Sequence, residues 1–493
     1  MPLRAAARSD RVEASHNSAD HALRYLSTRQ PTVPNETRSF EDILLAGLAP
    51  DGGLYVPAVL PRLDPGEIRR LGRLDYPALA AEIMGLFMGD AIGRDELTVL
   101  LRDAYAGFTH SAIAPLKQLG HDQWLLELFH GPTLAFKDYA LQVVGRLFDQ
   151  VLAKRGERVT IVGATSGDTG SAAIEACRDR ETVDIFILYP YGRTSEVQRR
   201  QMTTVPAANV HTLAVEGSFD DCQDLVKALF ADAEFRTRQN LSAVNSINWA
   251  RIAAQVVYYF WAATALGAPD RPVSFAVPTG NFGNIYAAHI ARRLGLPIGK
   301  LIVGTNRNDI LHRFIATGEM RISTVEPSLS PSMDIQVSSN FERLLFELAG
   351  QDGIRLDEMM RAFRATGRLP AGKDIWDEAR HLFASHRLDD DGIRAMIARI
   401  HRETGELIDP HTAVAVSAMR AEGRADGVPC VALACAHPAK FPDIVEQATG
   451  RRPSLPPPLA DLMTRQERIN IVPNDLAAIR NFIAARTRQG RAA

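Results

Sequence analysis

Two segments of the chain show the same order of a short apolar run, a glycine-containing loop and an amphipathic stretch. The first segment spans residues 158–178 and has its loop at 163–170; the second spans 272–294 and has its loop at 278–283. Short β-branched runs predict buried strands, and apolar positions spaced by three and four residues predict helices. The pattern therefore predicts two units in which a strand, a loop and a helix follow one another.

Other apolar runs lie between and after these units. They cover residues 183–188, 210–215, 301–303 and 428–433. Strands that alternate with helices are typical of a mostly parallel sheet with helices on both faces. We therefore predict an α/β fold for the middle of the chain.

The regions around this middle part have helical periods. Residues 40–110 carry Pro and Gly interruptions, and residues 341–402 show a helical pattern without strands. The most apolar stretch, 252–266, is shorter than the roughly 18 residues of a membrane-spanning helix and so predicts a buried helix. Near the end, a Pro-rich stretch at 453–458 precedes an amphipathic helix at about 474–485.

These patterns divide the chain into four predicted parts. Residues 1–22 lack the apolar core of a secretory signal, so we expect a flexible extension there rather than a targeting peptide. Residues 23–115 form an N-terminal domain, and residues 116–450 form an α/β core with a helical insertion at about 340–405. Residues 451–493 form a Pro-rich linker and a C-terminal helix.

Composition narrows the class of partner. The 493 residues are 46% apolar and 23% charged, which is the balance of a globular protein of two or three domains. A net charge of −2 provides no overall field for nucleic acid or an anionic membrane. Four scattered cysteines fit neither a disulfide framework nor a metal knuckle. We expect a cytoplasmic protein with small-molecule partners, no metal, no nucleic acid and no membrane.

The two glycine loops are candidate anion sites. A helix N-terminus presents unpaired backbone N–H groups and a partial positive charge, which suit a phosphate or carboxylate. Neither loop has the Walker A spacing or a Gly-x-Gly-x-x-Gly pattern, which argues against ATP and NAD. Each loop alone is as well explained by a tight turn, whereas the pair indicates two anionic groups.

Lys137 is the candidate nucleophile. It follows the turn Gly131-Pro132 and comes directly after Phe136. Burial lowers the pKa of a lysine and makes its neutral amine available for imine formation. From residue chemistry alone, however, the alternative of a solvated surface lysine remains the more common case.

The run from Leu128 to Asp138, Leu-Phe-His-Gly-Pro-Thr-Leu-Ala-Phe-Lys-Asp, resembles the Schiff-base lysine segment of the threonine synthase family. Further segments resemble the same family in the same order, and the resemblance covers about residues 23–443. These segments are residues 25–29, 41–57, 165–170, 245–251, 280–284, 330–335 and 436–441. The resemblance implies pyridoxal-phosphate fold type II, the tryptophan synthase β-like fold. This fold has two Rossmann-like open-sheet domains, and we expect this chain to add a small N-terminal domain and a helical insertion to them.

The same resemblance implies a set of site residues. Lys137 would hold pyridoxal 5′-phosphate as a Schiff base, and Asp168 and Cys435 would face the cofactor ring. The cofactor phosphate would lie on the second loop, at Gly280, Asn281, Phe282, Gly283 and Asn284. The first loop would grip the substrate carboxylate through Thr165, Ser166 and Thr169. The phosphate of O-phospho-L-homoserine would lie on Asn245, Ser246 and Arg251, since a planar guanidinium binds phosphate through two hydrogen bonds.

Several of these residues have simpler alternatives. Asp168 could be only a helix N-cap, and Arg251 could form a salt bridge on a helix surface. For His130 and His437 we favour structural hydrogen bonding over proton transfer.

Cys435 departs from the family pattern, which usually has a threonine whose hydroxyl meets the pyridine nitrogen of the cofactor. A thiol is a weaker hydrogen-bond donor and acceptor than a hydroxyl. Cysteine does stand at this position in serine dehydratase-like enzymes of the same fold type. The alternative is a small buried residue at the end of a strand.

The resemblance implies a reaction as well. O-phospho-L-homoserine would lose its γ-phosphate and add water at Cβ, giving L-threonine and phosphate in the last step of threonine biosynthesis. Two alternatives remain open at this point. A diverged enzyme would stop at 2-oxobutyrate plus phosphate or add another nucleophile, and a non-catalytic protein would only bind the cofactor. We expect a monomer or a homodimer.

Overall fold

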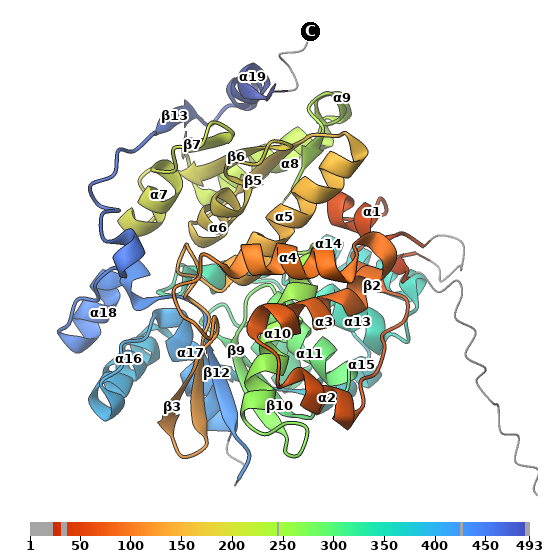
Figure 1. Cartoon of the computed structure of the whole chain (residues 1–493), viewed down its shortest axis with the longest axis vertical. Helices are drawn as coiled ribbons and strands as arrows, with labels where there is room; N and C mark the ends of the chain where they lie inside the picture. The colour runs from red at the N-terminus through yellow and green to blue at the C-terminus, as the bar shows by residue number, and fades with distance from the viewer. Residues whose placement is uncertain (1–22, 31–36, 244–245, 424–426, 489–493) are drawn as a thin grey trace, which may run out of the picture.

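The computed structural model describes residues 23–30, 37–243, 246–423 and 427–488. The predicted extension at residues 1–22 lies outside the described residues. Within them, the chain forms two separate open sheets, one above the other in Figure 1, with helices packed on both faces of each sheet. This arrangement confirms the predicted α/β fold with two open-sheet domains.

The five-stranded sheet is parallel throughout and contains the first glycine loop. Its strand order is β13 (Asn470–Pro473), β7 (Val210–Glu216), β6 (Val183–Pro190), β5 (Val159–Ala164) and β8 (Leu241–Ser242). One face packs against α5 (Lys137–Arg155), α6 (Asp168–Cys177) and α7 (Glu196–Thr203). The other packs against α8 (Phe219–Ala231), α9 (Ala233–Arg238) and α19 (Leu476–Arg486). All eight residues of β6 are buried, as expected for a central parallel strand covered on both faces.

The six-stranded sheet contains the second glycine loop. Its strand order is β11 (Phe383–Arg387), β10 (Ile298–Thr305), β9 (Val273–Pro278), β12 (Cys430–Ala434), β4 (Gln123–Glu127) and β3 (Leu116–Gly120). Only the edge pair β3–β4 is antiparallel. One face packs on α16 (Asp390–Thr404) and α17 (Pro410–Glu422), and the other on α10 (Trp249–Ala265) and α11 (Gly283–Arg293).

The N-terminal part consists of helices and one small two-stranded sheet. β1 (Tyr25–Ser27) pairs antiparallel with β2 (Tyr55–Pro57). The helices are α1 (Phe40–Ala46), α2 (Pro65–Leu71), α3 (Tyr76–Met88) and α4 (Arg94–Tyr105). Together with α10 and α5 they enclose the largest apolar core of the chain.

The helix α10 confirms the buried helix predicted at 252–266. It packs against α3, α5 and α11, and almost every residue along it is buried. Among the helices in the described part of the chain, none has the combined length and apolar character needed to cross a membrane.

The prediction that residues 341–402 contain no strand was wrong in one respect. It does contain α13 (Phe341–Leu348), α14 (Gly353–Thr366), α15 (Lys373–Leu382) and most of α16, but β11 lies between α15 and α16 and extends the six-stranded sheet. β11 has only one fully buried residue at the sheet edge, so its sequence carries too few apolar positions to predict a strand.

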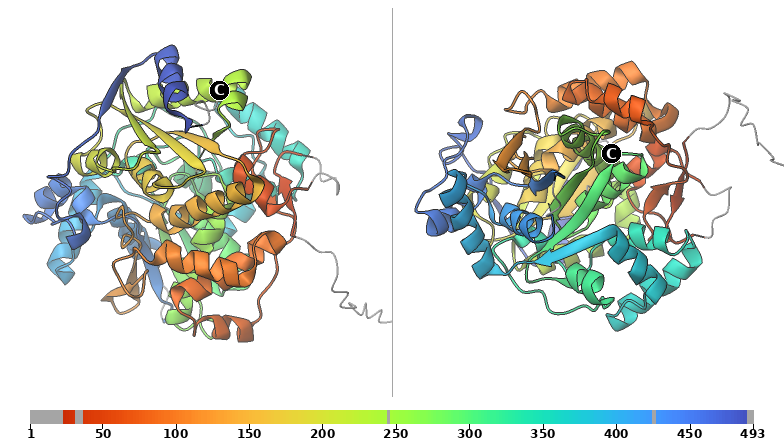
Figure 2. Two further views of the ribbon diagram at one scale, coloured as in Figure 1. Left: turned by 45° about the horizontal axis from the view of Figure 1, so that its top comes forward. Right: turned by 90° about the horizontal axis from the view of Figure 1, so that it is seen from below.

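Several other strands were missed, among them β13, β3 and β4. β13 follows the Pro-rich stretch and pairs with β7, and the left view of Figure 2 shows it with α19 beside the five-stranded sheet. β3 is half-buried and polar in sequence, and the short apolar run of β4 was overlooked. β13 depends on a tertiary partner rather than on a local pattern, whereas β3 and β4 pair with each other across a short turn.

Candidate active site

Lys137 is the first residue of α5, and the turn before it is fixed by its neighbour. Asp138 accepts hydrogen bonds from the backbone N–H (2.8 Å) and the hydroxyl (2.6 Å) of Thr133. Gly131 leaves room for this contact, because a Cβ there would lie 2.5 Å from the Cβ of Asp138. Burial raises the pKa of Asp138 to about 6, while the bonds from Thr133 oppose that rise. The turn thus aims Lys137 into the interior.

The side chain of Lys137 is buried, with 9% of the residue exposed. Its Nζ lies 3.4 Å from Oγ of Ser332 and 3.7 Å from Oδ2 of Asp168. Burial lowers the pKa of Lys137; the charge of Asp168 opposes this, whereas the nearby cations Lys440 and Arg251 lower the pKa further. The alternative of a solvated surface lysine was wrong, and burial shifts the amine toward its neutral form.

The first glycine loop joins β5 to α6. Thr165 is buried, and its Oγ1 accepts hydrogen bonds from the backbone N–H groups of Gly167 (3.0 Å) and Gly170 (2.9 Å). Gly167 has φ of 143°, a conformation that favours glycine. Ser166 and Thr169 are half-buried. Thr165 therefore shapes the loop from within, and the two half-buried residues remain candidates for binding substrate.

Asp168 is the first residue of α6, and its carboxylate has partners on several elements. Oδ1 lies 2.8 Å from Nζ of Lys440 and accepts a 2.9 Å hydrogen bond from Gln198, and Oδ2 faces Lys137 and Ser332. Burial alone would raise its pKa, but the charges of Lys440 and Lys137 outweigh burial and hold the pKa of Asp168 far below its usual range. The N-cap alternative was wrong, because Gly167 occupies the N-cap position and Asp168 makes no cap hydrogen bond.

The second glycine loop joins β9 to α11. Phe282 is the N-cap of α11 with φ of 62°, and its ring is buried against Phe341 and Phe383, so only its backbone can face a ligand. Gly280 approaches the backbone of another segment, where a Cβ would lie 3.0 Å from the Ser332 carbonyl oxygen. The loop therefore offers the N–H groups of a helix N-terminus, with Gly283 at its first position.

Asn340, which the sequence analysis did not identify, ties this loop to the segment before α10. It is fully buried, and its Nδ2 donates to the carbonyl oxygens of Ser246 (3.1 Å) and Asn281 (3.0 Å). Its own backbone N–H also donates to Asn281 (3.1 Å). Ser246 is thus held beside the second loop, while Asn245 lies outside the described residues.

Arg251 lies on α10 and is 3% exposed. Its Nε and Nη1 have no hydrogen-bond partner within the described ranges. Burial lowers the pKa of Arg251 to about 10. The surface salt-bridge alternative was therefore wrong. A buried guanidinium with unbonded nitrogens is costly unless an anion completes it, so Arg251 is a candidate anion ligand.

Cys435 follows β12 directly and is 5% exposed. Its carbonyl oxygen accepts a 2.8 Å hydrogen bond from the N–H of Phe136, the residue before Lys137. Its Sγ lies 3.8 Å from Nδ2 of Asn284, whose Oδ1 accepts from the hydroxyls of Tyr258 (2.5 Å) and Tyr259 (2.8 Å). Burial raises the pKa of the Cys435 thiol well above its usual value, so the thiol stays neutral.

His130 and His437 make structural contacts, as expected. His437 accepts a hydrogen bond from the N–H of Ala439 (3.1 Å) and caps the short helix η3 (Pro438–Lys440). Burial lowers the pKa of His437 to about 4. His130 bonds through Nε2 to Glu127 at 2.8 Å.

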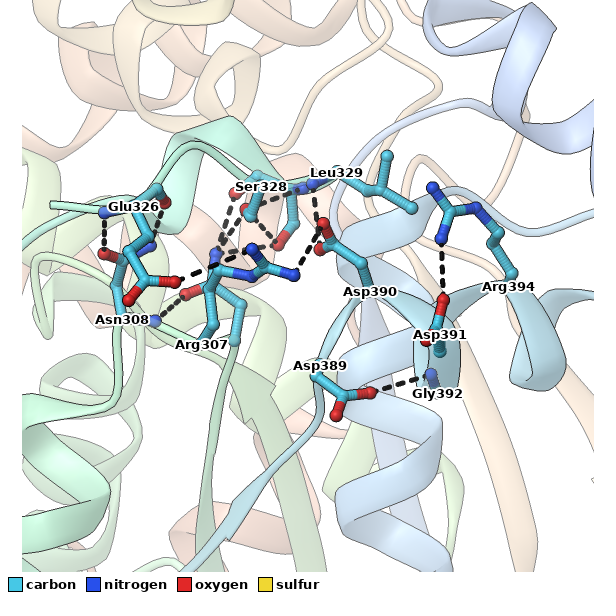
Figure 3. A network of polar contacts seen from close by, with 12 residues as sticks. Arg307, Asn308, Glu326, Ser328, Leu329, Asp389, Asp390, Asp391, Gly392 and Arg394 are labelled. Carbon is cyan, nitrogen blue, oxygen red and sulfur yellow. Dashed lines mark hydrogen bonds and ion pairs between the residues drawn. The ribbon is translucent and has the colours of Figure 1, made fainter.

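Ser332 and Lys440 were also missed as individual residues, although both lie in segments that carried the family resemblance. Ser332 lies on η2 (Pro331–Met333), within a long connection between α12 (Ile310–Thr317) and α13. Figure 3 shows the polar network that holds this connection: Arg307 lies between Glu326 (3.6 Å) and Asp390 (3.2 Å). Because Arg307 follows β10 and Asp390 begins α16, these ion pairs tie the connection that carries Ser332 to the domain of the six-stranded sheet.

Taken together, these groups suit a phosphate-bearing aldehyde cofactor. A buried amine with a lowered pKa lies among two helix N-termini and a guanidinium whose Nε and Nη1 lack partners within the described residues. In the described residues, no group of three or more His, Cys, Asp or Glu side chains is placed to hold a metal ion.

Comparison with protein families gives three matches along the chain. Residues 24–105 match the threonine synthase N terminus, 109–436 the pyridoxal-phosphate dependent enzyme family, and 412–483 the threonine synthase C-terminal family. The middle match includes Lys137 and both glycine loops.

Individual relatives agree with these matches. A threonine synthase of Pseudomonas aeruginosa is 55% identical over 95% of this chain and 100% of the relative. The crystal structure of pyridoxal-phosphate-bound threonine synthase from Brucella melitensis is 48% identical and superposes with a TM-score of 0.92, covering 94% of this chain and 100% of that one. The yeast threonine synthase structure is 39% identical with a TM-score of 0.89, covering 94% and 99%.

Proposed function

Because this chain belongs to the threonine synthase family, whose members are pyridoxal-phosphate enzymes of fold type II, we propose that it converts O-phospho-L-homoserine and water to L-threonine and phosphate. The observation that carries this proposal is Arg251. The guanidinium of Arg251 lacks partners for Nε and Nη1 within the described residues and lies near the buried amine of Lys137. A substrate that carries both an amino group and a phosphate requires two such groups close together.

Each part of the site has a role in this proposal. Bound pyridoxal phosphate supplies a ring that stabilises negative charge on substrate carbons. The backbone N–H groups at Gly280 to Asn284 bind the cofactor phosphate, and Nζ of Lys137 holds the cofactor and then takes up and returns protons at substrate carbons. The first loop, with Ser166 and Thr169, binds the substrate carboxylate.

The phosphate end of the substrate is bound by Arg251, with Ser246 and Asn245 beside it. The charge-assisted hydrogen bonds from Arg251 stabilise the phosphate in the substrate and also as it leaves. Cys435, a neutral thiol beside Asn284, would meet the cofactor ring without adding a charge.

Product analysis tests the proposal. Purified protein is incubated with O-phospho-L-homoserine, and released phosphate, threonine and 2-oxobutyrate are measured together. Equal amounts of phosphate and threonine are expected. Phosphate accompanied by 2-oxobutyrate and no threonine would establish the diverged lyase instead. Cofactor binding without turnover of amino-acid substrates would establish the non-catalytic alternative.

Cys435 is the specific observation that favours the lyase as second candidate, because it replaces the hydroxyl usual in the family. For the remaining properties we keep the predictions made from sequence: a monomer or homodimer, acting in the cytoplasm on a small molecule.

A further inference from the structure

The site contains a second buried lysine, Lys440, to which the proposed reaction assigns no role. Lys440 is 0% exposed. Its Nζ lies 2.8 Å from Oδ1 of Asp168 and donates a 2.8 Å hydrogen bond to the carbonyl oxygen of Thr133, in the turn before Lys137. Lysine is almost never fully buried without a partner, so this ammonium and the carboxylate of Asp168 form a buried ion pair.

The two oxygens of Asp168 are divided between two sets of partners. Oδ1 is held by Lys440 and by Nε2 of Gln198 at 2.9 Å. Oδ2 is left facing Nζ of Lys137 at 3.7 Å. Gln198 cannot easily move away, because its side chain packs against Gly167, where a Cβ would lie 2.5 Å from it. The orientation of the carboxylate toward Lys137 is therefore set from the side of Lys440.

We propose that Lys440 is a positioning residue that holds Asp168 and balances its charge, and thereby keeps Lys137 in the neutral form that reacts with the cofactor. This inference rests on the proposed attachment of pyridoxal phosphate at Lys137. With Lys440 in place, Asp168 already has a counter-charge. Protonation of Lys137 therefore adds less electrostatic stabilisation to the carboxylate. Without Lys440, the carboxylate would be paired only by an ammonium on Lys137.

The charged and titratable groups that face Lys137 come from four elements. Asp168 on α6 and Cys435 after β12 raise the pKa of Lys137, whereas Lys440 on η3 and Arg251 on α10 lower it in addition to burial. Removal of Lys440 therefore takes away one lowering effect and strengthens that of Asp168. Both changes act in the same direction and raise the pKa of Lys137.

The test follows cofactor loading rather than turnover. The full chain is freed of cofactor, and the rate at which it regains the visible absorption of bound pyridoxal phosphate is measured from pH 6 to pH 10. This rate depends on the fraction of neutral Lys137. For Lys440→Met we expect the midpoint of the pH–rate profile to move upward by about one pH unit, so that loading below the midpoint is about tenfold slower. Lys154→Met, which removes an exposed lysine paired with Glu41, should leave the midpoint unchanged.

A second variant separates charge balance from folding. The double variant Lys440→Met/Asp168→Asn removes both members of the buried pair, and its midpoint should return to within about 0.3 pH units of the wild type. If Lys440→Met loads more slowly at every pH without a shift in midpoint, or if the double variant shifts as far as the single one, Lys440 has only a structural role. If Lys440→Met does not fold, the double variant is compared directly with the wild type. A midpoint equal to that of the wild type supports the proposal, and a raised midpoint overturns it. A wild type that gains no covalent cofactor at any pH would instead refute attachment at Lys137.

Discussion

Replacement of Arg251 by methionine should make the ligand-free protein more stable while it damages substrate binding. Burial lowers the pKa of Arg251 from 12.5 to about 10. A tenfold change in acidity corresponds to about 1.4 kcal/mol, so keeping this guanidinium charged in the folded chain costs about 3 kcal/mol. Both pKa values lie above neutral pH. The cost is therefore fully present at pH 7.5 and is relieved only as the pH rises through about 10.

Arg251→Met keeps the apolar stem and removes the charge, so the free energy of unfolding of the ligand-free chain should rise by about 1–3 kcal/mol. Urea denaturation at pH 7.5 measures this change. In steady-state kinetics the same variant should raise KM for O-phospho-L-homoserine by about 10- to 100-fold, since hydrogen bonds from a charged donor contribute about 1.5–3 kcal/mol each. Its content of pyridoxal phosphate should change little.

Arg343 is the matched control. It is equally buried, and its pKa is also lowered to about 10 by burial. Arg343, however, donates to the carbonyl oxygens of Tyr55 (3.0 Å) and Ile247 (2.5 Å) and to Asn340. Arg343→Met should destabilise the chain by about 3–5 kcal/mol, because three acceptors lose their donor. If Arg251→Met destabilises the chain to a similar extent, Arg251 has a structural partner and its assignment as an anion ligand is refuted.

Three further variants test the rest of the site. Lys137→Ala should abolish the visible absorption of bound cofactor and its trapping by borohydride; persistence of both would remove the central assignment. Cys435→Thr should leave the ratio of threonine to phosphate at one, with turnover equal or higher, and a change of product measured by chromatography would favour a diverged reaction. Asn340→Asp should weaken binding of both pyridoxal phosphate and substrate by about tenfold, because a carboxylate oxygen would face the Ser246 and Asn281 carbonyls. Asn209→Asp disturbs another buried amide, bonded to the carbonyls of Cys177 and Val183, and should lower stability without changing either affinity.

The strands that could be predicted from sequence are those in which the local pattern and the burial agree. β6 is apolar along its length because helices cover both of its faces, and it was predicted from residues 183–188. β11 and β13 are edge strands with one buried residue each, so their sequences carry little apolar signal. Their existence depends on a neighbouring strand that is remote in sequence, which no local window contains.

The features of the site also differ in whether they depend on local sequence or on remote segments. A loop before a helix is a local feature, so the pattern of strand, loop and helix was enough to locate both glycine loops. The burial of Lys137 is not local, because it depends on Asp168, Ser332 and Lys440 from three other segments. Residue chemistry therefore could not separate Lys137 from a surface lysine, and the family resemblance supplied what the local pattern lacked.

The charges around Lys137 lead to a last prediction, that inorganic phosphate stabilises the ligand-free chain. Lys440 already neutralises Asp168, so Arg251 is left without a counter-charge among the described residues. A phosphate bound there should stabilise the folded state by about 1.4 kcal/mol at ten times its Kd. Urea denaturation in phosphate and in chloride of equal ionic strength measures the effect. Arg251→Met should lose most of this stabilisation, since the variant lacks the buried guanidinium that would bind the anion. An equal effect of phosphate on both proteins would place the anion elsewhere and separate Arg251 from substrate binding.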